Sequence, residues 1–320
     1  MIIEDLMPRT GESSVKDKLL AGLRSDPKTI PSVFFYDHRG SELFEQITQL
    51  EEYYPPMIEI PLLASTARKL EQDLKNCDIV ELGSGDCSKI SVFLDEVPED
   101  VRATMTYYPV DVCKEAIEKS ACNLHEKYPE IKIHGITADF LEHMEKIPGN
   151  RKRFFCFFGS TIGNLSDARS MEFMENLGEV MNVNDRLILG MDMVKDISVI
   201  EKAYNDDQGV TAEFNRNILN VTNDHLGTDI NPADFEHVAF FNREYSRIEM
   251  HLRAKRDLEI TIPELDEHII IEKGEMIHTE NSHKYSVDDI VKLADAGGLD
   301  VEEIFTDEKK WFSLVEMVKR

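Results

Sequence analysis

The 320-residue sequence lacks several features that would assign it to particular protein classes. It has no run of about 18 uncharged apolar residues, so we expect no membrane-spanning helix. Its first residues include acidic side chains and no apolar stretch, so we expect no secretory signal. The five cysteines are scattered and form no CxxC pair. We therefore expect neither a disulfide framework nor a bound metal, and a reducing cytoplasm as the location.

Basic residues are also scarce. Lys and Arg number 36 against 62 Asp and Glu, which gives a formal net charge of −26. Such a surface repels nucleic acids and anionic membranes, and no cluster of Lys and Arg offsets the repulsion. Adaptation to high salt and simple solubility are two equally good explanations for the excess of acidic residues. We expect a monomer whose partner is a small molecule.

Strand and helix patterns alternate from about residue 77 onward, without internal repeats. Apolar segments such as "DIVEL" and "DRLILGMDMV" read as buried strands, and "CKEAIEKSACNLHEKY" carries apolar residues at helical spacing. Alternating strands and helices predict a parallel sheet covered on both faces, the doubly wound α/β class.

The alternation stops between about residues 195 and 285. A helical pattern over Val199–Leu226 is followed by three segments that alternate like an antiparallel meander. The α/β pattern then returns, with Ser286 and Asp289 placed as in a capping box. We predict an α/β domain from residues 63–194 and 286–320, and a second α+β lobe, expected to bind substrate, from 1–62 and 195–285.

Two glycines follow the first predicted strand directly, in the turn Gly83-Ser84-Gly85. Glycine lets the backbone approach a ligand closely, and the following helix start directs amide groups toward it. The third glycine of the GxGxxG dinucleotide motif is absent. A tight turn without any ligand is the alternative explanation.

Acidic residues end the next two predicted strands. Asp111 is placed to accept hydrogen bonds from ribose hydroxyls, as acidic residues at the second strand end do. Asp139 and Phe140 end the third strand, where an acid meets an adenine amino group and an aromatic ring covers the base. Together with the glycine turn, these residues predict an adenosine pocket.

The final strand identifies the kind of adenosine ligand. "DVEEIFTD" and "WFSLVEMVKR" are separated by too few residues for a crossover helix, so the last strand is expected to run antiparallel. A parallel sheet with one late antiparallel strand resembles the Rossmann-like fold of S-adenosylmethionine-dependent methyltransferases. That resemblance implies S-adenosylmethionine as methyl donor, with the glycine turn making room for its methionine part.

Longer strings resemble one family within that fold. They begin at about residue 33 and run in order to the end of the sequence: "FFYDHRGSELFEQITQLEEYYPPMIE", "ELGSGDCSK", "FFGSTIGNL", "AYNDDQGVTAEFNRNIL", "RIEMHLRA" and "HTENSHKY". Together they resemble the histidine Nα-methyltransferases of ergothioneine biosynthesis. The resemblance implies an enzyme that trimethylates the α-amino group of L-histidine to hercynine.

The same resemblance implies roles for individual residues. Asn164 and Tyr204 would hold the backbone end of the amino acid as catalytic residues, and Glu280 and Ser282 would bind its imidazole. The remaining substrate-binding positions would be Tyr36, Tyr53 and Met250. The cofactor-binding positions would be Gly83, Ser84, Gly85, Lys89, Asp111, Asp139 and Phe140.

Ordinary structural explanations exist for these residues as well. Asn164 is also a plausible helix cap, Tyr204 and Met250 are also consistent with a core, and Glu280 with a solvated strand charge. Two other functions stay open at this stage. One is Nα-methylation of tryptophan or another aromatic amino acid, which Glu280 disfavours, and the other is a non-catalytic S-adenosylmethionine-binding regulator.

Overall fold

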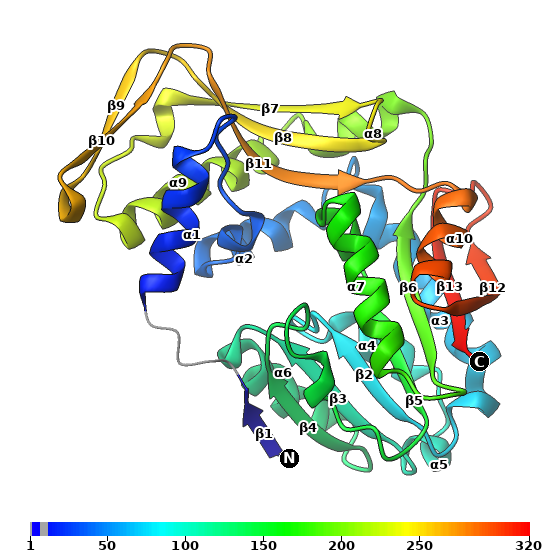
Figure 1. Ribbon diagram of the computed structural model, residues 1–320. Coiled ribbons are helices and arrows are strands. Elements are labelled where there is room, and N and C mark those ends of the chain that lie inside the picture. The colour runs from blue at the N-terminus through cyan, green and yellow to red at the C-terminus, as the bar shows by residue number, and fades with distance from the viewer. Residues whose placement is uncertain (1, 7–11) are drawn as a thin grey trace. The chain divides into compact units, whose positions relative to one another are not determined.

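The computed structural model describes residues 2–6 and 12–320 (Figure 1). The chain forms two compact units. The first unit combines Met1–Pro8, Pro55–Val194 and Lys284–Arg320, and the second unit combines Arg9–Tyr54 and Lys195–His283.

The first unit is built on one eight-stranded sheet with the order β1-β4-β3-β2-β5-β6-β13-β12. Neighbouring strands are parallel except β13, which runs antiparallel to both β6 and β12. The strands are β1 (Ile2–Asp5), β2 (Asp78–Leu82), β3 (Thr106–Asp111), β4 (Lys132–Thr137), β5 (Arg153–Phe157), β6 (Arg186–Asp192), β12 (Leu299–Thr306) and β13 (Phe312–Lys319). The predicted doubly wound sheet with an antiparallel last strand is confirmed.

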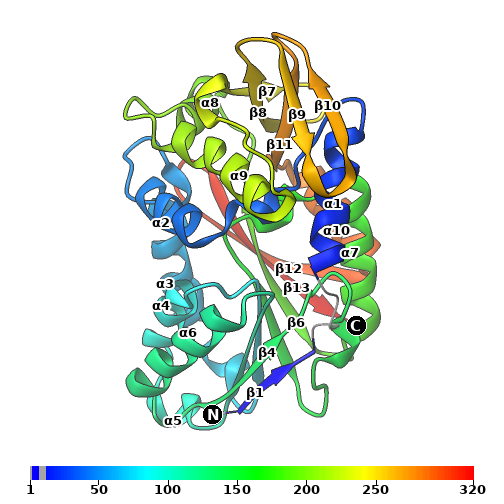
Figure 2. The ribbon, with the colours of Figure 1, turned by 90° about the vertical axis from the view of Figure 1, so that its left-hand side faces the viewer.

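Helices cover both faces of this sheet (Figure 2). One layer consists of α3 (Tyr54–Leu74), α4 (Ser88–Asp95), α5 (Glu99–Arg102) and α6 (Lys114–Lys127), and the other of α7 (Asp167–Val180) and α10 (Val287–Ala296). Successive strand residues point to opposite faces. Ile79 accordingly packs in the core under the first layer and Val80 in the core under the second. Both faces are buried, which explains the continuous apolar strand sequences.

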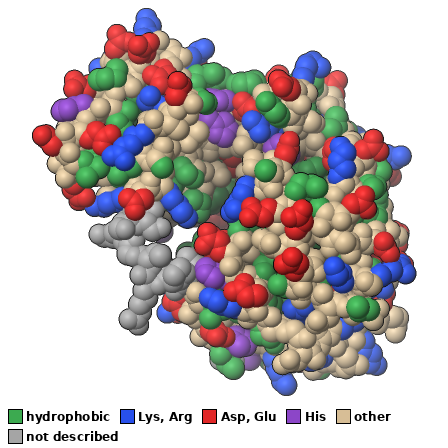
Figure 3. All heavy atoms as spheres, viewed as in Figure 1, with side chains coloured by type: hydrophobic (Ala, Val, Ile, Leu, Met, Phe, Trp, Pro, Cys, Tyr) green, Lys and Arg blue, Asp and Glu red, His purple; other side chains and the backbone are tan. Residues whose placement is uncertain are grey.

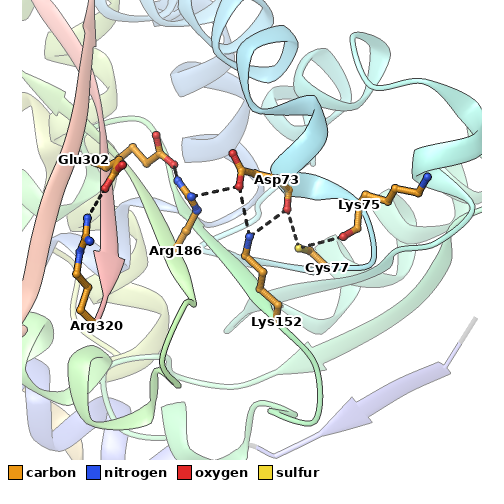
Figure 4. Close-up of polar contacts among 8 residues, drawn as sticks. Asp73, Lys75, Cys77, Lys152, Arg186, Glu302 and Arg320 are labelled. Carbon is orange, nitrogen blue, oxygen red and sulfur yellow. Dashed lines mark hydrogen bonds and ion pairs between the residues drawn. The ribbon is translucent and has the colours of Figure 1, made fainter.

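An ion-pair network fastens β13 to its neighbours (Figure 4). Arg186, at the start of β6, donates to Glu316 of β13 and to Asp73 of α3, the latter at 3.1 Å. Lys152 lies 3.6 Å from the same Asp73 carboxylate. Glu316 is buried, and removal from water raises its pKa despite the neighbouring guanidinium. A buried carboxylate of this kind needs its cationic partner, so loss of Arg186 would leave the Glu316 charge uncompensated between β6 and β12.

The second unit combines helices with two small antiparallel sheets. A three-stranded sheet has the order β11-β8-β7, and β9 and β10 form a separate hairpin. The strands are β7 (Phe235–Asn242), β8 (Arg247–Ala254), β9 (Leu258–Ile262), β10 (Glu267–Ile271) and β11 (Met276–His283). The helices are α1 (Glu12–Arg24), α2 (His38–Ile47), α8 (Ile197–Tyr204) and α9 (Val210–Leu226). Short 3-10 turns in the chain are η1 (Ser32–Phe35), η2 (Met144–Lys146), η3 (Thr161–Asn164), η4 (Pro232–Asp234) and η5 (Pro263–Leu265).

The helical pattern over Val199–Leu226 corresponds to two helices, α8 and α9, with a break between them that the pattern did not predict. Asp206 lies in the break, and its carboxylate accepts hydrogen bonds from the amides of Val210 and Thr211 at 2.9 and 2.8 Å. A side-chain acceptor at that place satisfies the free amides of a new helix start. Gly209, with φ of +74°, completes the turn.

The predicted unit boundaries also need correction at the N-terminal side. β1 pairs with β4 at the edge of the large sheet, and most of α3 packs on that sheet, so Ile2–Asp5 and Pro55–Leu74 belong to the first unit. Residues 1 and 7–11, which the prediction placed in the second lobe, lie outside the described residues. The predicted capping box is confirmed, since Ser286 and Asp289 exchange hydrogen bonds at the start of α10.

Candidate active site

The turn after β2 has the geometry that the glycine pattern predicts. Gly83 and Gly85 have φ of +66° and +51°, a region that residues with a Cβ rarely adopt. A Cβ on Gly85 would meet no atom within 4 Å, so the space beside the turn is open. The turn leads directly into α4. A left-handed glycine turn before a helix start is a suitable cradle for the polar end of a ligand.

Asp111, at the end of β3, is held against this turn. Its carboxylate accepts hydrogen bonds from the amide of Gly85 at 2.9 Å and from that of Cys113 at 3.0 Å. Each carboxylate oxygen can accept a second hydrogen bond, so both remain available to a ribose diol. The side chain is only partly buried, which leaves it accessible.

Asp139 and Phe140 follow β4 on the same edge of the sheet. The Asp139 carboxylate accepts a hydrogen bond from the Leu141 amide at 3.0 Å, which fixes its orientation. The Phe140 ring packs edge-on against Phe157 and Phe173, with ring centroids 5.3 and 6.1 Å apart. A Cβ on Gly83 would lie 3.6 Å from the Phe140 ring, so turn and ring are neighbours. The structure thus brings the predicted cofactor residues together along the carboxyl ends of β2, β3 and β4.

Lys89, in the first turn of α4, pairs with a glutamate that the sequence did not single out. Its ammonium lies 2.9 Å from the Glu59 carboxylate, which is 1% exposed, while Lys89 itself is 32% exposed. Glu59 also accepts a hydrogen bond from the Gly159 amide at 2.6 Å. Glu59 therefore ties the start of α4 to the loop after β5. The other hydrogens of the ammonium can meet a ligand carboxylate, such as that of a methionine moiety.

Asn164 lies in the loop after β5, at the end of η3. Gly159 and Ser160 precede it with φ of +76° and +56°, and the Ser160 hydroxyl accepts a hydrogen bond from the Asp192 amide at 2.9 Å. Left-handed backbone at a non-glycine residue is a feature that clusters at functional sites. Asn164 is not the cap of α7, because Ser166 accepts the capping hydrogen bond from Arg169.

The second unit gathers the predicted substrate residues into one cluster, except for Asn164, which belongs to the first unit. The Tyr204 hydroxyl donates a hydrogen bond to the Ser282 hydroxyl at 2.7 Å. The Tyr204 ring lies edge-on to that of Tyr53, with centroids 6.0 Å apart. Glu280 lies opposite Met250 in the register of β11 and β8, and the two side chains are 8% and 1% exposed. Met250 is therefore a core residue of the sheet beside Glu280, which is not the solvated charge of the alternative explanation.

Tyr36 belongs to the same cluster. The pKa of its hydroxyl is raised by removal from water, and further by the charge of Glu280 and by Tyr53 and Tyr204. Since 47% of Tyr36 remains exposed, the neighbouring groups are the more informative of these causes. Phe44, which the sequence reasoning missed, lies edge-on to Tyr36 and Tyr53 with centroids 5.7 and 6.4 Å apart. Three phenol rings and a phenyl ring thus form one aromatic cluster, with the Glu280 carboxylate close enough to Tyr36 to raise the pKa of its hydroxyl.

Comparison with known proteins shows the family to which the chain belongs. A sequence profile described as "Histidine-specific methyltransferase, SAM-dependent" matches residues 15–319. The histidine N-alpha-methyltransferase of Mycolicibacterium smegmatis is 40% identical over 278 residues, which cover 87% of this chain and 86% of that protein. The chain belongs to the histidine-specific, SAM-dependent methyltransferase family.

Two further proteins are similar to the chain. Ergothioneine biosynthesis protein 1 of Neurospora crassa is 29% identical over 87% of this chain, which corresponds to 32% of that longer protein. The mitomycin 7-O-methyltransferase MmcR has a TM-score of 0.50 at 12% identity, covering 90% of this chain and 60% of that chain, and shows the shared fold alone. As a member of the SAM-dependent methyltransferases, the chain uses S-adenosylmethionine as methyl donor.

The residues of the first unit fit this donor chemically. The glycine turn leaves open space for the methionine part of such a molecule. The accessible Asp111 carboxylate can accept from its ribose, and the part-exposed Lys89 ammonium can pair with its carboxylate. Among residues 2–6 and 12–320, no three or more His, Cys, Asp or Glu side chains form a group suited to a metal ion. Within the same ranges, no helix is long and apolar enough to cross a membrane. All five cysteines are free thiols.

Proposed function

We propose that the protein transfers methyl groups from S-adenosylmethionine to the α-amino nitrogen of L-histidine and forms the trimethylated betaine hercynine, a step of ergothioneine biosynthesis. In this proposal Asn164 and Tyr204 orient the backbone end of the amino acid, and Glu280 and Ser282 bind the imidazole. Tyr36, Tyr53 and Met250 complete the substrate-binding residues. Gly83, Ser84, Gly85, Lys89, Asp111, Asp139 and Phe140 bind the methyl donor.

The observation that carries the choice of histidine is the buried Glu280 beside a hydroxyl pair. Its carboxylate is an acceptor for one imidazole N–H, and the Ser282 hydroxyl, which lies 2.7 Å from that of Tyr204, is a donor or acceptor for the second ring nitrogen. A site built on matched polar contacts rejects amino acids whose side chains leave those contacts unpaired. Aliphatic side chains have no N–H to donate to the Glu280 carboxylate.

The surrounding residues suit a reaction that needs a neutral amine and forms a fixed cation. Methyl transfer is an in-line displacement, so alignment of the amine lone pair with the donated methyl group dominates the barrier. An α-amine has an ordinary pKa of about 8, so its deprotonation near neutrality costs little and no strong base is required. Amide and hydroxyl groups orient the nitrogen without holding its proton. Aromatic rings such as Tyr36 and Tyr53 suit a trimethylammonium product that has no N–H to donate.

The charge distribution supports a small-molecule substrate rather than a nucleic acid. On the face in Figure 3, Lys and Arg side chains occur singly among Asp and Glu, consistent with the net charge of −26. A monomer in a reducing cytoplasm is part of the same proposal, and the five free thiols suit a reducing location.

Nα-methylation of tryptophan or another aromatic amino acid is the second candidate. An indole has a single N–H that Glu280 could accept, and the rings of Tyr36 and Phe44 suit any planar side chain. The two candidates differ at Ser282, because an indole ring has no second nitrogen to pair with its hydroxyl.

The test is a screen of the twenty amino acids with S-adenosylmethionine, followed by mass spectrometry that counts and locates the added methyl groups. Histidine should be converted in preference to all others, with methyl groups on the α-nitrogen. Preferred conversion of tryptophan, or methylation of the imidazole ring, would refute the proposal. As a control for the assigned roles, Tyr204→Phe and Asn164→Ala should lower turnover while S-adenosylmethionine affinity stays nearly unchanged.

A further inference from the structure

β11 contains a bulge directly before Glu280. His278 lies opposite His251 of β8, yet Glu280 lies opposite Met250, so Thr279 is an extra residue without its own partner. Without the extra residue, Glu280 would face Glu249, on the other side of the sheet. Because a shift of one residue moves every following side chain to the opposite face, the bulge puts Glu280 and Ser282 on the Met250 face.

A fully buried amide holds this bulge. The Thr279 hydroxyl donates to the side-chain oxygen of Asn215 at 2.7 Å and shares its hydrogen with the Met250 carbonyl at 3.0 Å. Asn215 lies on α9 and is 0% exposed. Its amide nitrogen lies 3.0 Å from the His251 carbonyl, which can only accept, so the orientation of the amide group is fixed.

The second amide hydrogen of Asn215 determines the state of His237. The amide nitrogen lies 2.9 Å from Nδ1 of His237, and Nε2 of the same ring lies 2.9 Å from the Tyr204 carbonyl. A carbonyl only accepts, so Nε2 carries the hydrogen and Nδ1 is the acceptor for Asn215. Thr279, Asn215 and His237, here called the Asn215 network, therefore join the residue before Glu280 to the backbone of Tyr204.

We infer that the Asn215 network consists of positioning residues for the amino-acid substrate, which keep Glu280 and Ser282 at a fixed place relative to Tyr204. The inference rests on the proposed function, in which Tyr204 binds the backbone end of the amino acid and Glu280 and Ser282 bind its side chain. Every hydrogen bond in the network has one permitted direction. Loss of one member therefore leaves a buried group unpaired and allows the neighbouring side chain to change its orientation. Protonation of His237 would likewise place a hydrogen against the Asn215 amide, and burial lowers the pKa of His237 against that change.

Thr279→Val removes the hydroxyl while keeping the shape of the side chain, and it tests the inference most directly. We expect the KM for histidine to rise about tenfold, the scale of one buried hydrogen bond left unmade. The KM for S-adenosylmethionine should not change, because the network contains none of the proposed cofactor residues. Thr279→Ser keeps the hydroxyl and should restore the KM for histidine to within about twofold of the wild type.

Thr222→Val is the matched control. Thr222 is also buried in the second unit, but its hydroxyl donates only to the Ile218 carbonyl of its own helix. This variant should leave both KM values unchanged. Equal KM values for histidine in Thr279→Val and the wild type would overturn the inference, as would an equal rise in Thr222→Val or a failure of Thr279→Ser to rescue.

The ¹⁵N resonances of the His237 ring give a readout that does not depend on turnover. The wild type and Thr279→Ser should show the Nε2–H form with Nδ1 accepting a hydrogen bond, while in Thr279→Val the Nδ1 resonance should shift toward that of an acceptor without a hydrogen bond, because the Asn215 amide is no longer held in place. An unchanged ring in Thr279→Val would contradict the network. If Thr279→Val does not fold, His237→Phe breaks the same connection from its partly buried end and should raise the KM for histidine alone; an unchanged KM there would equally overturn the inference.

Wild-type turnover separates this inference from the proposed function. If the wild type methylates a different amino acid, the proposed function fails, and the same KM ratios measured with that amino acid still test the Asn215 network.

Discussion

Glu81, in β2 two residues before Gly83, gives a stability prediction that can be worked out in detail. The side chain is 3% exposed and accepts a hydrogen bond from the buried Tyr107 hydroxyl. Burial raises the pKa of Glu81 from 4.5 to about 8, and the opposing effects of the Tyr107 hydrogen bond and the Lys89 charge are smaller. The folded protein thus holds a proton on Glu81 over a pH range in which the unfolded chain releases it.

The sign and size follow from this difference. Below about pH 4.5 the carboxyl is protonated in both states, and the free energy of unfolding has its full value. Between about pH 4.5 and 8 only the unfolded chain releases the proton, so the free energy of unfolding falls by up to about 1.4 kcal/mol per pH unit. Between about pH 5 and pH 8 the loss from this one group amounts to roughly 3–4 kcal/mol.

Glu81→Gln removes the titration but keeps an oxygen that can accept from Tyr107. Relative to the wild type, the variant should therefore gain about 3–4 kcal/mol of unfolding free energy between about pH 5 and pH 8. Urea unfolding followed by tryptophan fluorescence measures this, because the single tryptophan, Trp311, lies in the first unit and reports on it alone. Glu99→Gln, at an exposed glutamate of the same unit, controls for the loss of one charge.

A difference between Glu81→Gln and the wild type that changes by less than about 1 kcal/mol across this range would refute the reasoning, since it would mean that Glu81 ionises almost as easily in the folded protein as in the unfolded chain. Equal denaturant slopes for the two proteins are the condition for comparing their free energies.

Three further predictions concern the binding sites. Asp111→Ala should weaken S-adenosylmethionine binding by about 1.5–3 kcal/mol, because it removes an acceptor for the ribose and a support of the glycine turn; isothermal titration with unchanged affinity would disprove the assignment. Glu280→Met should lower the ratio of kcat/KM for histidine over tryptophan by about tenfold or more, since a charged acceptor is worth roughly 1.5–3 kcal/mol to the imidazole and less to an indole. An equal ratio in both proteins would mean that Glu280 does not contact the side chain. Glu59→Gln should weaken S-adenosylmethionine binding by about tenfold, because Lys89 loses its buried counter-charge while the Gly159 amide keeps an acceptor. Titration calorimetry measures this affinity, and a value equal to that of the wild type would show that Lys89 does not need the Glu59 charge.

Periodicity and turn chemistry predicted most of the first unit from sequence. The apolar strands, the glycine turn and the short link before β13 each have one structural solution, and together they indicate the sheet with its antiparallel strand. The break at Asp206 was missed because the apolar spacing continues from α8 into α9, and only the capping hydrogen bonds separate them. β1 was missed because four residues are too few for a pattern to identify a strand.

The candidate site was predictable only in part, because its residues do two kinds of work. Glycines and strand-end acids carry their chemistry in local sequence, so Gly83 and Asp111 could be named. Glu59 and Asn215 act through partners far away in the chain, at Gly159 and Thr279, and nothing near them in sequence signals those contacts. The bulge at Thr279 likewise appears only once the register with β8 is known.

The interior place of β13 has a consequence for synthesis on the ribosome. β6 and β13 are neighbours in the sheet but far apart in the chain, as their green and red colours show (Figure 1). While Lys195–His283, α10 and β12 are being translated, the nascent sheet carries an open edge along Arg186–Asp192. An unpaired edge strand is a template for pairing with other chains. Until residues 312–319 leave the exit tunnel, the growing polypeptide depends on dilution or chaperones to keep that edge from aggregating.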